Sequence, residues 1–204
     1  MPGPMKTSPT RLLVLRHGES EWNVAGRWQG RADVPLTERG RRQALLAAEQ
    51  LESPDGIVAS TLVRAAHTAE IIGDVLGVTS PALDDRLVET DVGPWEGLTR
   101  REIDARWPGY LDEMRMPKGF EATTDVVARA HRAFVDLAVR YPGATLLVVS
   151  HSGLIRTLRR HHGASDRRLH NLEGCWFDVS GEGVHSVGAV WSPLTTDGDA
   201  TESL

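Results

Sequence analysis

The chain has 204 residues and a hydrophobic content of 40%, which suit one compact domain with a substantial core. Its formal net charge of -5 gives the surface no general attraction for nucleic acid or for an anionic membrane, so we expect neither as a partner. The single cysteine, Cys175, excludes an intramolecular disulfide and a cysteine-based zinc cluster. No stretch approaches the roughly 20 apolar residues of a membrane span, and the N-terminal residues lack the apolar run of a secretory signal. We therefore expect a cytoplasmic protein that is one domain over residues 1–204, with flexible ends at 1–9 and 193–204.

The hydrophobic pattern predicts strands and helices in alternation, which favours a mostly parallel sheet covered on both faces. Thr37 is a candidate N-cap, and Gly77 is a candidate C-terminal stop for the helix before it. In chain order, we expect a strand at 12–15, a helix from 37 to about 51, a strand at 56–60, a helix at 61–76, an extended piece at 78–83, a short helix at 99–107, a helix at 124–141, a strand at 145–149, a helix at 153–161, and strands near 175–179 and 184–189.

Two of these buried strands each end close to a histidine. The strand at 12–15 runs into His17, and the strand at 146–149 runs into His151. In open α/β sheets, ligands bind in the crevice beyond the carboxyl ends of the strands. This repetition predicts that the two histidines share a ligand site.

The tripeptide Arg16-His17-Gly18 is the sharpest local signal. The Arg16 guanidinium offers a rigid fork of donors that suits phosphate oxygens. His17 can act as a nucleophile if one ring nitrogen is tied to a backbone carbonyl, because the other nitrogen is then free to attack. Gly18 allows a ligand to approach the backbone closely. By itself, however, the tripeptide is equally compatible with the exposed end of a strand.

Four ordered blocks of residues resemble the signature of the histidine phosphatase superfamily, which includes the cofactor-dependent phosphoglycerate mutases. The resemblance spans residues 11–156, and four blocks in the family's order make it highly specific. The blocks are 15–23 with its continuation at 28–30 and 33–40, then 60–65 with 68–70, then 87–89 with 93–97, and finally 150–151. The resemblance and the element pattern together predict a phosphoglycerate mutase-like three-layer α/β sandwich, with its site at the carboxyl ends of the first and fourth strands.

The resemblance implies that His17 takes the phosphoryl group and that Arg16, Arg64 and His151 surround the phosphate. A phosphoryl group in transfer spreads negative charge over its oxygens, so two arginines and a histidine can stabilise it without a metal. We therefore expect no cofactor and no metal. The expected substrate-binding residues are Gly18, Asn23, Gln29, Gly30, Trp95 and Ser152, of which Trp95, with Trp22 and Trp28, is expected to line a leaving-group pocket.

A phosphate monoester also needs a proton for its leaving oxygen, and a carboxylic acid can supply it. The resemblance implies that Glu89 is this general acid, which then acts as the base on the attacking water. On residue types alone, Asp84, Asp85, Asp91 and Glu96 are equal candidates.

The block around Glu89 separates two reactions within the superfamily. Mutases usually carry an Arg and a Tyr-Gly after this glutamate and a long insertion before the second histidine. Here Glu89 is followed by 90–93, Thr-Asp-Val-Gly, and the interval to His151 is compact. The resemblance therefore implies a phosphoric monoester hydrolase of the histidine acid phosphatase type, acting on small-molecule phosphate monoesters.

Three alternatives stay open: a cofactor-dependent phosphoglycerate mutase, a non-catalytic relative that binds a phosphorylated ligand, and a metallohydrolase with His17, Glu89 and His151 as ligands. The two late strands offer an edge through which a homodimer can form. His161 and His162 are neighbours on a predicted helix, so we expect their side chains to point apart, in poor geometry for one metal.

Overall fold

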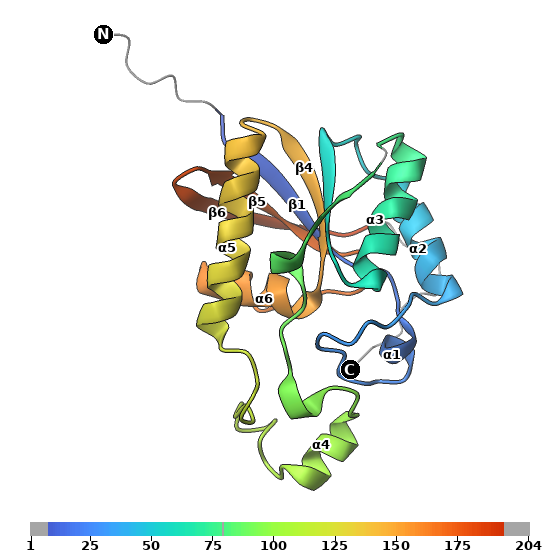
Figure 1. Cartoon of the computed structure of the whole chain (residues 1–204), viewed down its shortest axis with the longest axis vertical. Helices are drawn as coiled ribbons and strands as arrows, with labels where there is room; N and C mark the ends of the chain where they lie inside the picture. Colours follow the sequence, from blue (N-terminus) through green and yellow to red (C-terminus); the bar gives the residue numbers. More distant parts are fainter. Residues whose placement is uncertain (1–7, 79, 194–204) are drawn as a thin grey trace.

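The computed structural model describes residues 8–78 and 80–193, so the predicted flexible ends lie almost wholly outside the described residues (Figure 1). Within that part of the chain, one sheet is flanked by helices on both faces. Its strands are β1 (Thr10–Arg16), β2 (Gly56–Ser60), β3 (Ala82–Asp84), β4 (Thr145–Ser150), β5 (Gly174–Ser180) and β6 (Gly183–Trp191). The helices are α1 (Glu21–Val24), α2 (Glu38–Ala48), α3 (Val63–Leu76), α4 (Arg100–Arg106), α5 (Thr123–Arg140) and α6 (Ser152–His161), with short 3-10 helices η1 (Asp85–Leu87) and η2 (Gly93–Trp95).

The strands lie side by side in the order β3-β2-β4-β1-β5-β6. The first four of these pair in parallel, whereas β5 is antiparallel to both β1 and β6. In the β1–β4 pair Arg16 is opposite Ser150, and the N–H of His17 donates to the carbonyl of Ser150 at 3.0 Å. The register therefore brings His17 and His151 to the same edge of the sheet, and the predicted α/β sandwich is confirmed.

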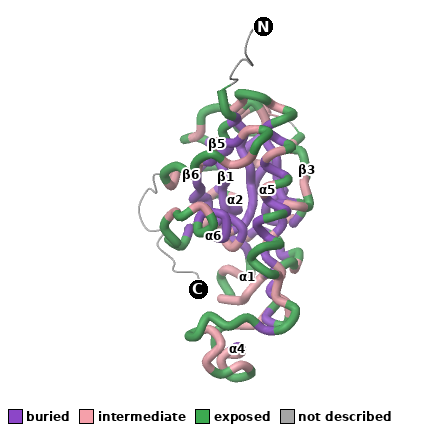
Figure 2. Tube along the Cα trace, turned by 90° about the vertical axis from the view of Figure 1, so that its left-hand side faces the viewer, coloured by how far each residue is buried: buried purple, intermediate pink, exposed green. Residues whose placement is uncertain are grey.

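Alternating residues of the central strands supply both cores, because successive side chains of a strand point to opposite faces. Leu12 and Val14 pack with α5 and α6, whereas Leu13 and Leu15 pack with α2 and α3. Burial on both faces explains why these strands read as uninterrupted apolar runs in the sequence. Figure 2 shows this buried interior in the sheet and in the helices that cover it.

A smaller cluster lies beyond the carboxyl edge of the sheet, in the segment that contains η2 and α4 (Figures 1 and 2). Trp95 and Ile103 are fully buried there, and Phe120 packs against them. The hydrophobic periodicity of the sequence predicts only the short helix α4 in this region. The rest is held together by aromatic packing and has no amphipathic period.

Most predicted boundaries lie within a few residues of the observed ones. Thr37 caps α2 by accepting from the N–H of Gly40 at 2.9 Å, and Gly77 ends α3 in the left-handed conformation at φ +70°. The helix predicted to reach Leu51 ends at Ala48, and α1 and both 3-10 helices are too short to leave a periodic signal. No helix among residues 8–78 and 80–193 is long and apolar enough to cross a membrane.

Helix α2 packs directly against the loop that follows His17. A methyl group at Gly40 would overlap the backbone oxygen of Glu19, and one at Gly18 would overlap the carbonyl of Gly40. The same loop is tied to the start of α2 by Thr37, whose hydroxyl donates to Glu19 Oε1 at 2.8 Å. The contact between the two backbones fixes the loop that carries the first histidine.

We predict that Gly40→Ala lowers the free energy of unfolding by about 1–3 kcal/mol, because the added methyl group pushes α2 away from the loop. Helix propensity alone predicts the opposite sign, a gain of about 1 kcal/mol. Urea denaturation measures the difference. Gly181→Ala is the control, since a methyl group there meets only Val139 Cγ2 at 3.4 Å. A Gly40→Ala variant as stable as the wild type would contradict the close contact.

Candidate active site

Arg16 ends β1 and is almost completely buried. Its Nη1 donates to the carbonyl of Leu169 at 2.7 Å, whereas its buried Nε has no partner among the described residues. Burial lowers the pKa of Arg16 to about 10, helped by the charge of Arg168, so the side chain remains a cation at neutral pH. A buried cationic donor without an acceptor is suited to an anionic ligand.

The imidazole of His17 is held in one tautomer. Its Nδ1 lies 2.6 Å from the carbonyl oxygen of Gly18, and because a carbonyl only accepts, Nδ1 carries the proton. The opposite nitrogen, Nε2, therefore has a lone pair, which accepts from Arg64 Nε at 3.2 Å. Burial, together with the charges of Arg64 and Arg16, keeps the pKa of His17 well below its usual range. The ring is thus neutral at neutral pH, with the arrangement that the sequence predicts for a nucleophile.

Arg64 lies in the first turn of α3, and the loop between α1 and α2 holds its guanidinium. Its Nη1 donates to the carbonyl of Ala32 at 2.6 Å and its Nη2 to that of Gly30 at 3.0 Å. Burial lowers the pKa of Arg64 to about 10, although the charge of Glu89 opposes this shift. Gly30 therefore acts through its carbonyl, and it adopts φ +51°, a conformation that favours glycine.

His151 follows β4 and is the N-cap residue of α6. Its ring centroid is 5.2 Å from that of His17, and its Nε2 lies 2.8 Å from Ser60 Oγ at the end of β2. Burial, and then the charge of Arg64, hold the pKa of His151 well below its usual range. Its buried Nδ1 has no partner among the described residues and is a second group available to a ligand.

Glu89 lies at the N-terminus of α6, beside His151. Its carboxylate accepts from the backbone N–H groups of Thr90 at 2.7 Å, Gly153 at 2.9 Å and Leu154 at 3.1 Å. A methyl group on Gly153 would overlap Glu89 Oε1, so this helix start requires glycine. The three N–H donors therefore orient the carboxyl group of Glu89 at the N-terminus of α6.

Three of the competing carboxylates have other partners. Asp84 pairs with Arg86 at 2.7 Å, Asp91 accepts from the N–H of Gly93, and Glu96 accepts from the N–H groups of 31 and 32. The fourth, Asp85, begins η1. Among these five acidic residues, Glu89 alone bonds to the helix start that follows His151.

The remaining expected residues lie in the segments that follow β1 and β4. The N–H of Gly18 donates to Thr68 Oγ1 at 3.1 Å, and Ser152 is the first residue of α6. The hydroxyl of Ser20 lies 3.0 Å from Asn23 Oδ1 and 2.9 Å from Gln29 Oε1, which links these two amides. These contacts connect two parts of the segment between β1 and α2.

Trp95 is placed differently from the prediction that it lines a leaving-group pocket. Its ring is enclosed by those of Trp28, Trp107 and Phe120, at centroid distances of 5.1, 6.5 and 5.8 Å. Edge-to-face contacts with these rings cover the apolar surface of Trp95 inside the smaller cluster. Trp95 therefore supports the segment after Glu89 from within.

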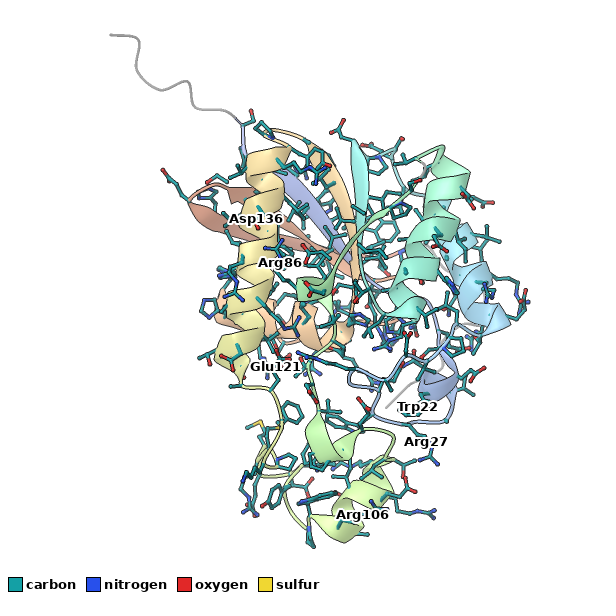
Figure 3. All side chains as sticks on the ribbon, viewed as in Figure 1. Trp22, Arg27, Arg86, Arg106, Glu121 and Asp136 are labelled. Carbon is teal, nitrogen blue, oxygen red and sulfur yellow. The ribbon has the colours of Figure 1, made fainter. Side chains whose placement is uncertain are left out.

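Arg129 is a residue that the sequence reasoning missed. From α5 it donates to the carbonyls of Arg86, Val88 and Glu89 at 2.7, 2.6 and 3.1 Å. It also pairs with both oxygens of Glu121. Glu121 lies just before α5, where Figure 3 labels it. A cation within the apolar stripe of a predicted helix is the signal that could have identified it, because buried charges are rare unless they are paired.

Asn171 was also missed, since it lies in a loop without periodicity. Its Nδ2 donates to the carbonyl of His17 at 2.9 Å and approaches Asn23 Oδ1 at 3.3 Å. It ties the loop before β5 to the backbone of the first histidine.

The prediction that His161 and His162 point apart is wrong. Helix α6 ends at His161, and His162 is its C-cap residue at φ −93° and ψ 16°, so helical geometry does not separate the two rings. Their centroids are 5.1 Å apart, and His131 of α5 lies beside both. Within the described part of the chain, these three form the one group of His, Cys, Asp and Glu with ligand atoms close enough to share a metal.

Comparison with known proteins agrees with this geometry. A family model described as the histidine phosphatase superfamily (branch 1) matches residues 12–181, a range that contains every site residue described above. The chain is 40% identical over 163 residues to glucosyl-3-phosphoglycerate phosphatase of Mycobacterium tuberculosis, covering 72% of this chain and 73% of that protein. It is 33% identical over 156 residues to phosphoserine phosphatase 1 of Hydrogenobacter thermophilus, covering 72% and 74%.

Solved structures give the same result. A mycobacterial glucosyl-3-phosphoglycerate phosphatase in complex with VO3 superimposes with a TM-score of 0.76 at 34% identity, covering 83% of this chain and 92% of that one. The sequence match, the fold and the characterised relatives all support phosphatase activity. The chain belongs to the histidine phosphatase superfamily, branch 1.

Proposed function

We propose that this protein is a metal-independent phosphatase that hydrolyses small-molecule phosphate monoesters through a phosphohistidine on His17. The observation that carries this proposal is the state of the His17 ring. Its Nδ1 proton is fixed on the Gly18 carbonyl, and its unprotonated Nε2 faces the guanidinium of Arg64. A neutral imidazole with a free lone pair among cations is what nucleophilic attack on a phosphate dianion requires.

In the first step, Nε2 of His17 attacks phosphorus and the bond from phosphorus to the ester oxygen breaks. The phosphate oxygens replace Nε2 as acceptors for the N–H at Arg64 Nε. They also accept hydrogen bonds from Nε of Arg16 and from Nδ1 of His151. Glu89, as the carboxylic acid, gives its proton to the leaving oxygen, and the alcohol departs. The charges of Arg16 and Arg64 stabilise the equatorial oxygens of the group in transfer.

In the second step, water attacks the phosphohistidine. Glu89, now the carboxylate, takes a proton from the water, the bond between phosphorus and Nε2 breaks, and inorganic phosphate forms. Nε2 recovers its lone pair and the Glu89 carboxyl recovers its proton, so the cycle is balanced. The three backbone N–H groups around Glu89 fix the position of its carboxyl group in both steps.

Two relatives indicate the substrate class. One is named for glucosyl-3-phosphoglycerate and the other for phosphoserine, so both act on small phosphorylated metabolites. We propose that this chain hydrolyses a phosphate monoester of the same class, in which the leaving group is an alcohol that needs a proton.

The proposal is tested by phosphorus NMR with 3-phosphoglycerate, phosphoserine and p-nitrophenyl phosphate in the presence of EDTA. We expect inorganic phosphate from at least one substrate and a loss of about a thousandfold or more in His17→Asn, because the nucleophile is removed. His185→Asn is the control, since that exposed histidine lies on β6.

The outcomes separate the alternatives. Phosphate release that persists in His17→Asn, or that stops in EDTA, would contradict a metal-independent phosphohistidine. Conversion of 3-phosphoglycerate to 2-phosphoglycerate without phosphate release, with 2,3-bisphosphoglycerate added, would identify a mutase. No turnover and no trapped phosphoenzyme would identify a ligand-binding protein.

We predict that Arg129→Lys lowers kcat about 10- to 100-fold with little change in KM, because an ammonium cannot hold three carbonyls and Glu121 in one geometry. The loss should be larger with phosphoserine than with p-nitrophenyl phosphate, whose leaving group is stable as an anion. Glu89→Gln should show the same dependence on the leaving group.

Arg132→Lys, on the same helix, is the matched control and should retain wild-type kinetics. An Arg129→Lys loss that is equal for both substrates would show that this arginine supports folding but does not position Glu89.

A further inference from the structure

Three imidazoles meet on the side of the molecule where α5 packs against α6. The ring centroids of His131 and His161 are 5.4 Å apart, those of His131 and His162 are 5.0 Å apart, and those of His161 and His162 are 5.1 Å apart. Nε2 of His131 lies 2.9 Å from Nε2 of His162, and one ligand atom from each residue fits within 4.8 Å of the others. The three residues therefore hold one ligand nitrogen each within a space that one metal ion can span.

The backbone that carries these rings is firmly placed. His131 follows Ala130, a fully buried residue of α5, and Leu158 of α6 is buried in the same hydrophobic cluster. His161 is the last residue of α6 and His162 its C-cap, so neither depends on a long loop for its position. The packed helices hold the three imidazoles together before any ligand binds.

We propose that His131, His161 and His162 form a binding site for a divalent transition metal of the zinc type, which bridges α5 to the C-terminal end of α6. Neutral imidazole nitrogen is a preferred ligand of Zn²⁺, Ni²⁺ and Cu²⁺. The group contains no carboxylate, so Mg²⁺ and Ca²⁺, which require oxygen ligands, are disfavoured. Three protein ligands leave a fourth position for water.

The geometry is close to that of a tetrahedral site. With metal–nitrogen bonds of about 2.0–2.1 Å, neighbouring nitrogens in a tetrahedral site are separated by roughly 3.3 Å. The 2.9 Å pair must open slightly, and atoms up to 4.8 Å apart must close. Each change requires a shift of about 1 Å or less per nitrogen, which rotation of the side chains supplies without moving the helices.

The arginines of α6 bear on the binding of a cation, because their positive charge repels it. Of the three arginines on α6, Arg156 and Arg160 lie against Asp166, at 2.9 and 3.7 Å, so their charge is partly neutralised. The third, Arg159, is buried. This metal site is also separate from the phosphate pocket. His161 comes nine residues after Ser152, which places it about 13 Å further along the helix axis.

A metal here would join the two helices that hold Glu89. Helix α6 contributes the N–H groups of Gly153 and Leu154, and α5 contributes Arg129, two residues before His131. The site therefore has a structural role, as a clamp between the elements that position a carboxylate of the proposed mechanism.

Zinc binding to untagged, EDTA-treated protein tests the proposal by calorimetry and thermal denaturation. We expect one Zn²⁺ per chain, bound at least tenfold more weakly in His131→Asn and in the more exposed variant His161→Asn. Because a ligand that binds only the folded state stabilises it, zinc at about a hundredfold above Kd should raise Tm by roughly 5–10 °C. X-ray absorption should show three imidazole nitrogens at about 2.0–2.1 Å.

Two control variants locate the ion. His185→Asn should bind zinc as the wild type does, and so should His17→Asn, which removes an imidazole from the phosphate pocket. Binding that is lost in His17→Asn but kept in His161→Asn would place the metal in the pocket and overturn the proposal. Folded wild-type protein that binds no stoichiometric zinc would overturn it as well.

Discussion

The hydrogen bond between Nδ1 of His17 and the carbonyl of Gly18 is the constraint on which the site depends. It fixes the proton on one nitrogen and leaves Nε2 as a lone pair, and burial together with two nearby arginines keeps the ring neutral. The backbone that supplies this carbonyl is placed by its contact with Gly40 of α2, where neither Gly18 nor Gly40 has room for a side chain. The position of the Gly18 backbone thus determines which nitrogen of the His17 ring carries the proton.

The rest of the fold brings a second imidazole, two arginines and a carboxylate close to that ring. Parallel pairing of β1 with β4 places His151 beside His17, and the start of α3 supplies Arg64. Buried cations are costly unless they are compensated, and here loop carbonyls satisfy part of each guanidinium while Glu89 supplies a negative charge nearby. Nε of Arg16 and Nδ1 of His151 have no partner among the described residues and are available to a phosphate, so the site is prepared for an anion before it binds.

Sequence patterns predicted the parts of this arrangement that depend on regular elements. His17 and His151 follow apolar strands, and parallel strands bring such positions to one edge. Glu89 could be selected only through the family resemblance, because its position depends on hydrogen bonds to the start of α6, a contact between distant segments. Arg129 lay within an apolar stripe and was overlooked. The expectation for His161 and His162 failed because it treated the two side chains as neighbours on a regular helix, whereas His162 is the C-cap residue just beyond the last residue of α6.

The most direct test of this account is the nitrogen NMR spectrum of the protein labelled with ¹⁵N-histidine, with His17→Asn used to assign the resonances. The account predicts that His17 carries its proton on Nδ1, that Nε2 is unprotonated at pH 7, and that this pattern persists at pH 6, below the usual histidine pKa of about 6.5. A His17 ring protonated on Nε2, or one that becomes an imidazolium across this range, would contradict it.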